Sequence, residues 1–171
     1  MHIRRLLTQD QLNNFDESIA LELIQKIEKG NIQNLSCSFL SVRAETVVLI
    51  AAALAQCPNL HTVNIAKNNL GQYGPATAEK LALAPSLHTV YMSGNNLGEH
   101  GPATAKNLAQ SLSIHIVNMG KNSVSSAEAI EIANFFSYKD NPIKLGIEDT
   151  HRWPILETIS NDNGQVHKSF E

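Results

Sequence analysis

The chain has 171 residues, of which 43% are hydrophobic, and its formal net charge is −3. This length and composition support one domain with a buried core. The sequence has no run or stripe of Lys and Arg, which argues against nucleic acid and anionic membranes as partners. The longest apolar run, residues 47–55, is too short to span a bilayer and predicts a buried helix.

Residues 1–31 are expected to form an N-terminal helical cap. Residues 1–12 lack the apolar core of a secretory signal, although they contain Arg4 and Arg5. A helix is predicted over residues 16–29, ending at Gly30, because apolar residues recur on one helical face. The residues on that face are Ile19, Leu23, Ile24 and Ile27.

The central part of the chain contains a 27-residue unit that occurs twice and then a third time more loosely. Residues 60–86 read LHTVNIAKNNLGQYGPATAEKLALAPS and residues 87–113 read LHTVYMSGNNLGEHGPATAKNLAQSLS, with 16 identities in 27 positions. The third copy opens at Ile114 as IHIVNMGKNSVSSAEAIEIANFF. Repetition at this period predicts a solenoid, in which each unit buries its apolar edge against its neighbours.

Each unit predicts a short strand followed by a turn and a helix. Its apolar residues follow the pattern L-x-x-L-x-L-x-x-N-x-L, and the alternation of Val63 and Ile65 indicates a strand with one buried face. A Gly-Pro pair then opens an Ala-rich segment. Proline at a first helical position lacks only an N–H that would be unpaired anyway, so helices are predicted over residues 76–83 and 103–112.

The repeated L-x-x-L-x-L-x-x-N-x-L pattern, followed each time by a G-P-A-T-A helix start, resembles the leucine-rich repeat family and its ribonuclease-inhibitor-like class. The resemblance implies an α/β solenoid that forms a short arc, with a concave parallel β-sheet and convex helices. It also implies that Asn68, Asn95 and Asn122 stack inward as a ladder. An asparagine amide suits that place, because it donates to and accepts from backbone groups that a turn leaves unpaired.

The pattern extends on both sides of the central units. Residues 32–42 repeat it with Leu40 in the place of the asparagine, and a helix over residues 45–56 follows, with Thr46 near its start. A last strand is predicted around Leu145. The repeats are therefore expected to cover residues 32–149.

Residues 150–171 are expected to form a C-terminal cap and tail. An open terminal repeat exposes apolar edges, which other residues must cover. Trp153, Pro154, Ile155 and Leu156 are expected to cover the last strand, and residues after 160 to form a loose polar tail.

The concave face is the expected binding surface for another protein. Helix-backed parallel sheets normally have both faces covered, so an open face indicates a docking partner. Tyr91, flanked by Asn64 and Asn118, is the expected anchor. An ordinary solvated face is the alternative interpretation. The predicted contact residues are Asn34, Ser36, Thr62, Asn64, Lys67, Thr89, Tyr91, Ser93, Ile116, Asn118, Lys121, Lys144 and Glu148.

If the concave face is not the interface, the turn edge around residues 72–73 and 99–100 ranks second. The residues around these positions are the same in both units, but residues 72–73 are Gln-Tyr and residues 99–100 are Glu-His.

Other features suggest chemistry but favour simpler interpretations. His61, His88 and His115 occupy one position of successive repeats and are expected to stack. A further good metal ligand is missing, so no metal site is predicted, and mutual repulsion on protonation is the stronger hypothesis. Cys37 and Cys57 are expected to be buried and reduced, which indicates a reducing compartment or export without an N-terminal signal.

The sequence therefore predicts a non-enzymatic protein-binding module with no cofactor. The family resemblance suggests one that covers the active site of a partner enzyme and inhibits or regulates it. A general scaffold without a single tight partner is the alternative. Small proteins of this kind also resemble effectors of intracellular bacteria, which gives two expected locations: the cytoplasm, or a host cell reached without a signal peptide.

Overall fold

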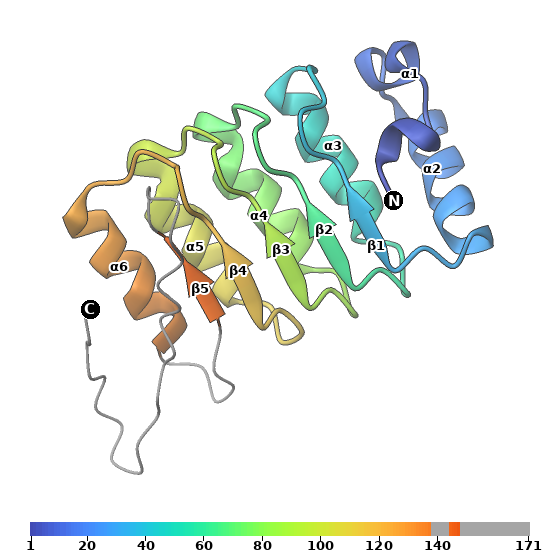
Figure 1. The fold of residues 1–171 in the computed structure, drawn as a ribbon. Helices are drawn as coiled ribbons and strands as arrows, with labels where there is room; N and C mark the ends of the chain where they lie inside the picture. The colour runs from blue at the N-terminus through green and yellow to red at the C-terminus, as the bar shows by residue number, and fades with distance from the viewer. Residues whose placement is uncertain (138–143, 148–171) are drawn as a thin grey trace.

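The computed structural model describes residues 1–137 and 144–147. The fold is α/β, with a parallel sheet along one side and helices behind it (Figure 1). The strands are β1 (Asn34–Ser36), β2 (Thr62–Asn64), β3 (Thr89–Tyr91), β4 (Ile116–Asn118) and β5 (Lys144–Gly146). The helices are η1 (Ile3–Arg5), α1 (Gln9–Asn13), α2 (Glu17–Lys29), α3 (Ala44–Leu54), η2 (Gly71–Tyr73), α4 (Gly74–Ala82), η3 (Gly98–His100), α5 (Gly101–Ala109) and α6 (Ser126–Ser137).

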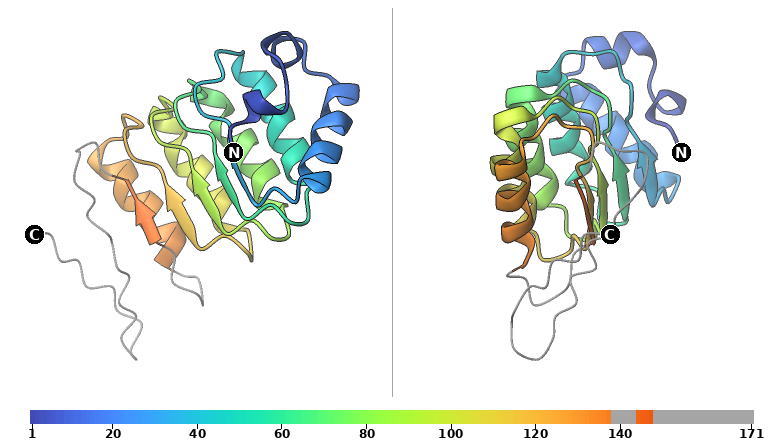
Figure 2. Two further views of the ribbon diagram at one scale, coloured as in Figure 1. Left: turned by 45° about the vertical axis from the view of Figure 1, so that its right-hand side comes forward. Right: turned by 60° about the vertical axis from the view of Figure 1, so that its left-hand side comes forward.

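The five strands lie side by side in chain order, each parallel to the next. The register follows the sequence repeat, because the central residue of each strand pairs with the residue 27 or 28 positions later. That row runs Leu35, Val63, Val90, Val117 and Leu145. A helix connects each strand to the next, and α3 to α6 pack beside one another on one face of the sheet (Figures 1 and 2).

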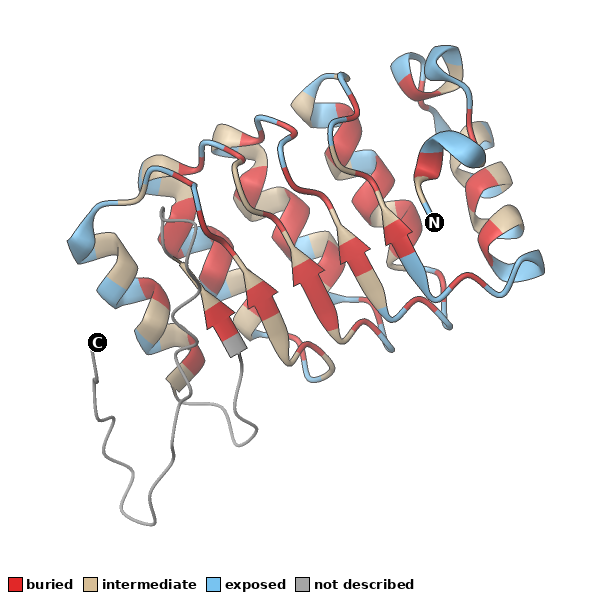
Figure 3. Cartoon of the chain, in the orientation of Figure 1, coloured by how far each residue is buried: buried red, intermediate tan, exposed pale blue. Residues whose placement is uncertain are grey.

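The core lies between the sheet and these helices. The central residue of every strand points into it and is buried, as the alternating pattern predicts (Figure 3). From the helices, apolar side chains of the inner face meet this row, among them Ile50, Leu81, Leu108 and Ile132. Alanines such as Ala78 and Ala105 are also fully buried, which allows the helices to approach one another.

Glycine at the start of α4 and α5 is required by close packing. A Cβ at Gly74 would collide with the Leu97 side chain of the next unit and lie 2.7 Å from Thr104 Oγ1. A Cβ at Gly101 would lie 2.7 Å from Val124 Cγ1. Both helices begin at these glycines, two residues before the predicted starts, because the preceding turns η2 and η3 lead directly into them. They also end earlier than predicted, at Ala82 and Ala109.

The two helices predicted at the N-terminal side are present, and α3 ends at Leu54, two residues earlier than predicted. Asp16 caps α2 by accepting a hydrogen bond from the Ile19 N–H at 2.9 Å. Gly30 ends that helix in a right-handed conformation, and Asn31 takes the left-handed one (φ 44°). Thr46 lies near the start of α3, as predicted, where it is the third residue and is buried; the N-cap is Arg43, which makes no side-chain capping bond.

Two short helices precede α2 that the sequence analysis did not predict, η1 and α1. Thr8 begins α1 with a capping box shared with Gln11. The chain before η1 lies along the outer edge of β1, where Met1 accepts a hydrogen bond from the Ser36 N–H at 2.7 Å. Arg4 donates to the carbonyl oxygens of Phe39 and Leu40 at 2.7 and 2.9 Å, which fastens this segment to the first turn after the sheet.

Several predictions concern residues outside the described part of the chain. They are the cover of the last strand by Trp153 and its neighbours, the polar tail and the position of Glu148. Within the described residues, no helix is both long enough and apolar enough to cross a membrane.

Candidate protein-binding face

The candidate site is the face of the sheet that points away from α3 to α6, called here the open face. Among the described residues, these helices lie on the opposite side, as the edge-on view in Figure 2 shows. The first and last residues of each strand point toward the open face because successive side chains alternate. In β1 to β4 these residues are Asn34, Ser36, Thr62, Asn64, Thr89, Tyr91, Ile116 and Asn118.

The last residues of β1 to β4 form a row across the middle of the open face, called here the central row. It consists of Ser36, Asn64, Tyr91 and Asn118. All four side chains are partly exposed. Asn64 and Asn118 flank Tyr91 on the neighbouring strands, as the sequence analysis predicted. Pairing places these positions about 4.8 Å from Tyr91 on either side. The structure therefore brings together an aromatic residue and two amides.

Each of these two asparagines also closes the turn that follows its own strand. Asn64 Oδ1 accepts a hydrogen bond from the Ala66 N–H at 2.9 Å, and Asn118 Oδ1 accepts one from the Gly120 N–H at 3.0 Å. Since only the oxygen of an amide accepts, the two contacts fix the orientation of both side chains.

The other row of the open face, at the first residue of each strand, is less accessible than predicted. Asn34 is exposed and Thr62 and Ile116 are partly exposed, but Thr89 is only 5% exposed. Thr89 lies between Thr62 and Ile116 on the adjacent strands, and its hydroxyl lies 3.2 Å from the Nδ1 of His88. Thr89 therefore offers almost no surface to a partner, contrary to the prediction.

A third row, the rim, follows the ends of the strands: Phe39, Lys67, Gly94 and Lys121. All four have a left-handed backbone, with φ between 52° and 65°, where the chain turns from the sheet toward the helices. Lys67 reaches across to the preceding unit, with its Nζ 4.5 Å from the centre of the Phe39 ring. Phe39 is 55% exposed. The rim thus adds an accessible aromatic ring with a cation over it.

Ser93, Lys144 and Glu148 complete the predicted contact set. Ser93 is partly exposed after β3, and its carbonyl accepts a hydrogen bond from the Lys67 N–H at 2.9 Å. Lys144 begins β5 and pairs with Ile116 through the sheet register. Glu148 lies outside the described residues.

Beneath the rim, Asn68, Asn95 and Asn122 form a buried ladder. Asn95 Nδ2 donates to the carbonyls of Ile65 and Met92 at 3.0 and 2.9 Å, and its Oδ1 accepts from the Asn68 N–H at 2.7 Å. The other two asparagines bond in the same way to their own units and to the units before them. In the first unit, Leu40 takes the place of the ladder asparagine, and its backbone N–H donates to Asn68 Oδ1 at 2.8 Å. The ladder holds the turns that carry the rim.

His61, His88 and His115 stack at the strand entrances, as predicted. The ring centres of His61 and His88 are 4.8 Å apart with nearly parallel planes, and those of His88 and His115 are 4.9 Å apart and tilted. Partial burial and the neighbouring imidazoles lower the pKa of His88. In the described part of the chain, no group of three or more His, Cys, Asp or Glu side chains is arranged to hold a metal ion.

Both cysteines are free and buried, as the sequence analysis predicted. Burial raises the pKa of the Cys37 thiol, and burial together with Glu28 raises the pKa of Cys57 to about 11. A thiol with a raised pKa is a poor nucleophile at neutral pH.

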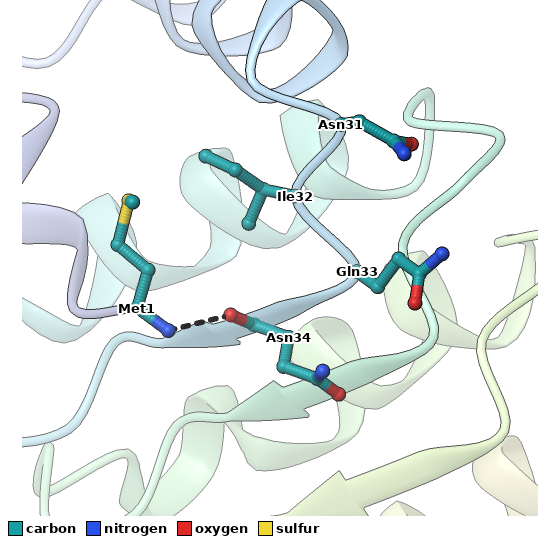
Figure 4. Close-up of a pocket in the computed structure, with 5 residues that line it drawn as sticks. All are labelled: Met1, Asn31, Ile32, Gln33 and Asn34. Atoms are coloured by element: carbon teal, nitrogen blue, oxygen red, sulfur yellow. Dashed lines mark hydrogen bonds between the residues drawn. The ribbon is translucent and has the colours of Figure 1, made fainter.

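A pocket lies beside the start of β1, at the opposite end of the open face from the rim. It is lined by Met1, Asn31, Ile32, Gln33 and Asn34 (Figure 4).

Comparisons with known proteins show a similar fold. No protein-family model matches the chain, and none of the curated proteins matches it. A solved structure of the leiomodin-1 actin-binding site 2 superposes with a TM-score of 0.61 over 77% of this chain and 80% of that chain, at 13% sequence identity. At this identity the likeness concerns the fold alone.

Proposed function

We propose that this chain is a non-enzymatic protein-binding module that holds its partner on the open face. We also propose that the fold is a leucine-rich-repeat solenoid of the ribonuclease-inhibitor-like class, and that the open face is its concave side. One observation carries it: a helix-backed parallel sheet presents a row of accessible side chains around Tyr91 with no helix of the described residues over it.

The composition of this face supports a protein as the ligand. It combines a partly exposed tyrosine, flanking amides and the exposed Phe39 ring, and interfaces are enriched in aromatic residues surrounded by polar contacts. The structural neighbour supports the same class of function, since it is an actin-binding site, a part of a protein that binds another protein.

The absence of catalysis is part of the proposal. Cys37 and Cys57 are buried with raised pKa values, and the Thr89 hydroxyl beside His88 is buried, so these candidate nucleophiles are inaccessible or weakly activated. Occlusion is one way in which a binding module without chemistry of its own acts on an enzyme. We therefore propose that it inhibits or regulates a partner enzyme by covering its active site.

The test compares Tyr91→Ala with Tyr73→Ala in affinity capture from a native lysate, read by mass spectrometry. Tyr73 is the matched control because it lies on the turn edge, where its hydroxyl donates to Glu45 at 2.6 Å. We expect one protein to be captured by the wild type and by Tyr73→Ala but lost with Tyr91→Ala, at a cost of about 2 kcal/mol or more in binding.

Thermal melting of the three purified proteins is the necessary control for folding. Loss of the partner with Tyr73→Ala, and not with Tyr91→Ala, would move the interface to the turn edge. Weak capture of many proteins by all three baits would instead indicate a general scaffold. A captured enzyme is then assayed with and without the module, and unchanged activity would contradict the inhibitor part of the proposal.

A further inference from the structure

The central row of the open face presents hydrogen-bond donors rather than acceptors. The Oδ1 atoms of Asn64 and Asn118 are already engaged by the backbone N–H groups of Ala66 and Gly120. Each side-chain amide has two N–H donors in addition to this oxygen. Within the described residues neither Nδ2 has a hydrogen-bond partner, so the amides offer N–H groups on both sides of Tyr91.

In the part of the chain that the structure describes, the charges beside this row are positive. Among the described residues, the outward positions of the strands and the rim include no Asp or Glu, whereas the rim includes Lys67 and Lys121. The whole chain has a net charge of −3, whereas Lys67 places a positive charge at the rim. The Lys67 ammonium lies 4.5 Å from the centre of the Phe39 ring, and Lys67 follows Asn64 by three residues in the same unit.

Repetition places two donor amides on the open face with a gap between them. The units that begin with β2 and β4 place an Asn in the central row and a Lys three residues later, at the rim, in the sequences NIAK and NMGK. The unit between them has Tyr91 and Gly94 at these positions. Since neighbouring strands are about 4.8 Å apart, the two asparagine positions are about 10 Å apart.

We propose that the central row binds acidic side chains of a partner protein, with one carboxylate at the Asn64 amide, a second at the Asn118 amide and apolar contact on Tyr91 between them. This inference rests on the proposed function and specifies the partner that the face selects. A carboxylate accepts hydrogen bonds only, and its bonds to N–H donors are strengthened by its charge. Lys67 at the rim favours the same sign of charge during encounter.

Asparagine-to-aspartate substitution separates the two roles of these residues. The double variant Asn64→Asp/Asn118→Asp keeps the oxygens that accept from Ala66 and Gly120 but replaces both N–H donors with carboxylate oxygens. The matched control is Asn13→Asp/Asn59→Asp, which makes the same change of charge at exposed positions outside the strands and the rim. In the control, Asn13 Oδ1 accepts from Gln9, a contact that an aspartate also makes.

The experiment selects 12-residue peptides from a random phage-displayed library on the wild-type protein. The enriched peptides are then synthesised, together with versions in which Asp and Glu become Asn and Gln. We expect Asp and Glu to be enriched and affinity to fall at least tenfold with the amide versions and with Asn64→Asp/Asn118→Asp. The control variant is expected to bind like the wild type, and all variants must melt cooperatively.

The outcomes distinguish this inference from the function on which it rests. Peptides that bind in a Tyr91-dependent manner without acidic enrichment, or whose affinity is unchanged by Asn64→Asp/Asn118→Asp, would overturn the acidic-partner inference and leave the binding face standing. Equal loss of binding in the control variant would also overturn it, because net charge alone would then explain the effect. Enriched peptides indifferent to Tyr91→Ala would overturn both.

Discussion

Replacing Asn95 with alanine is the most direct test of how the turns beneath the rim are held. Asn95 has no exposed surface and makes three hydrogen bonds. The alanine leaves the buried Asn68 N–H without its acceptor, which costs about 1–3 kcal/mol. The carbonyls of Ile65 and Met92 each lose one of two amide partners, because Asn68 and Asn122 also donate to them.

The two carbonyl losses are therefore smaller, about 0.5–1.5 kcal/mol each. Together with the orphaned N–H, we expect the free energy of unfolding to fall by about 2–6 kcal/mol, a large part of a typical stability of about 5–15 kcal/mol. Urea unfolding followed by circular dichroism measures this difference, provided that the slope with denaturant is the same for both proteins.

Asn107→Ala is the control. Its side chain makes one hydrogen bond, to the Pro75 carbonyl at 2.9 Å, from a partly exposed position within α5. We expect a loss of about 1 kcal/mol or less, since alanine also favours the helix. Asn95→Ala and Asn107→Ala of equal stability would refute the reasoning, because the ladder would then contribute no more than a single peripheral bond.

Two further predictions concern packing and pH. Gly74→Ala is expected to destabilise the fold by about 1–3 kcal/mol, because the new methyl group collides with Leu97. Gly98 has open space around it, so Gly98→Ala is expected to cost only about 1 kcal/mol, for its φ of +48°. Equal melting temperatures for the two variants would contradict this. The lowered pKa of His88 means that the unfolded chain binds more protons near pH 6, so stability is expected to fall as the pH drops below about 6.5 and to level off below the folded pKa. His88→Gln is expected to weaken this fall in urea midpoints between pH 7.5 and 5, and an identical fall in both proteins would exclude the histidine stack as its cause.

The repeat period predicted the sheet well because its register is a direct consequence of the spacing. Val63, Val90 and Val117 recur every 27 residues and pair in that register. The same spacing brought the three histidines into a stack. Helix starts were predicted two residues late because each predicted helix begins after the Gly-Pro pair, although Gly74 and Gly101 belong to the helix.

Features that depend on contacts between units were not predictable from the pattern. The burial of Thr89 depends on the side chains of both neighbouring strands and on the His88 ring. The contact between Lys67 and Phe39 joins two units that match poorly in sequence. The capping box at Thr8 and Gln11 is a local sequence signal for α1 that the repeat pattern does not contain.

The direction of the asparagine bonds has a consequence for how such a chain can grow. Every oxygen in the ladder serves the unit before it: Asn68 accepts from Leu40, Asn95 from Asn68 and Asn122 from Asn95. A 27-residue insert that begins at Leu60 or Leu87 therefore brings the acceptor that its predecessor needs and presents the N–H that its successor satisfies. Tandem duplication can lengthen the face one strand at a time without leaving a broken bond. The first unit, with no turn before it to serve, can have leucine there instead.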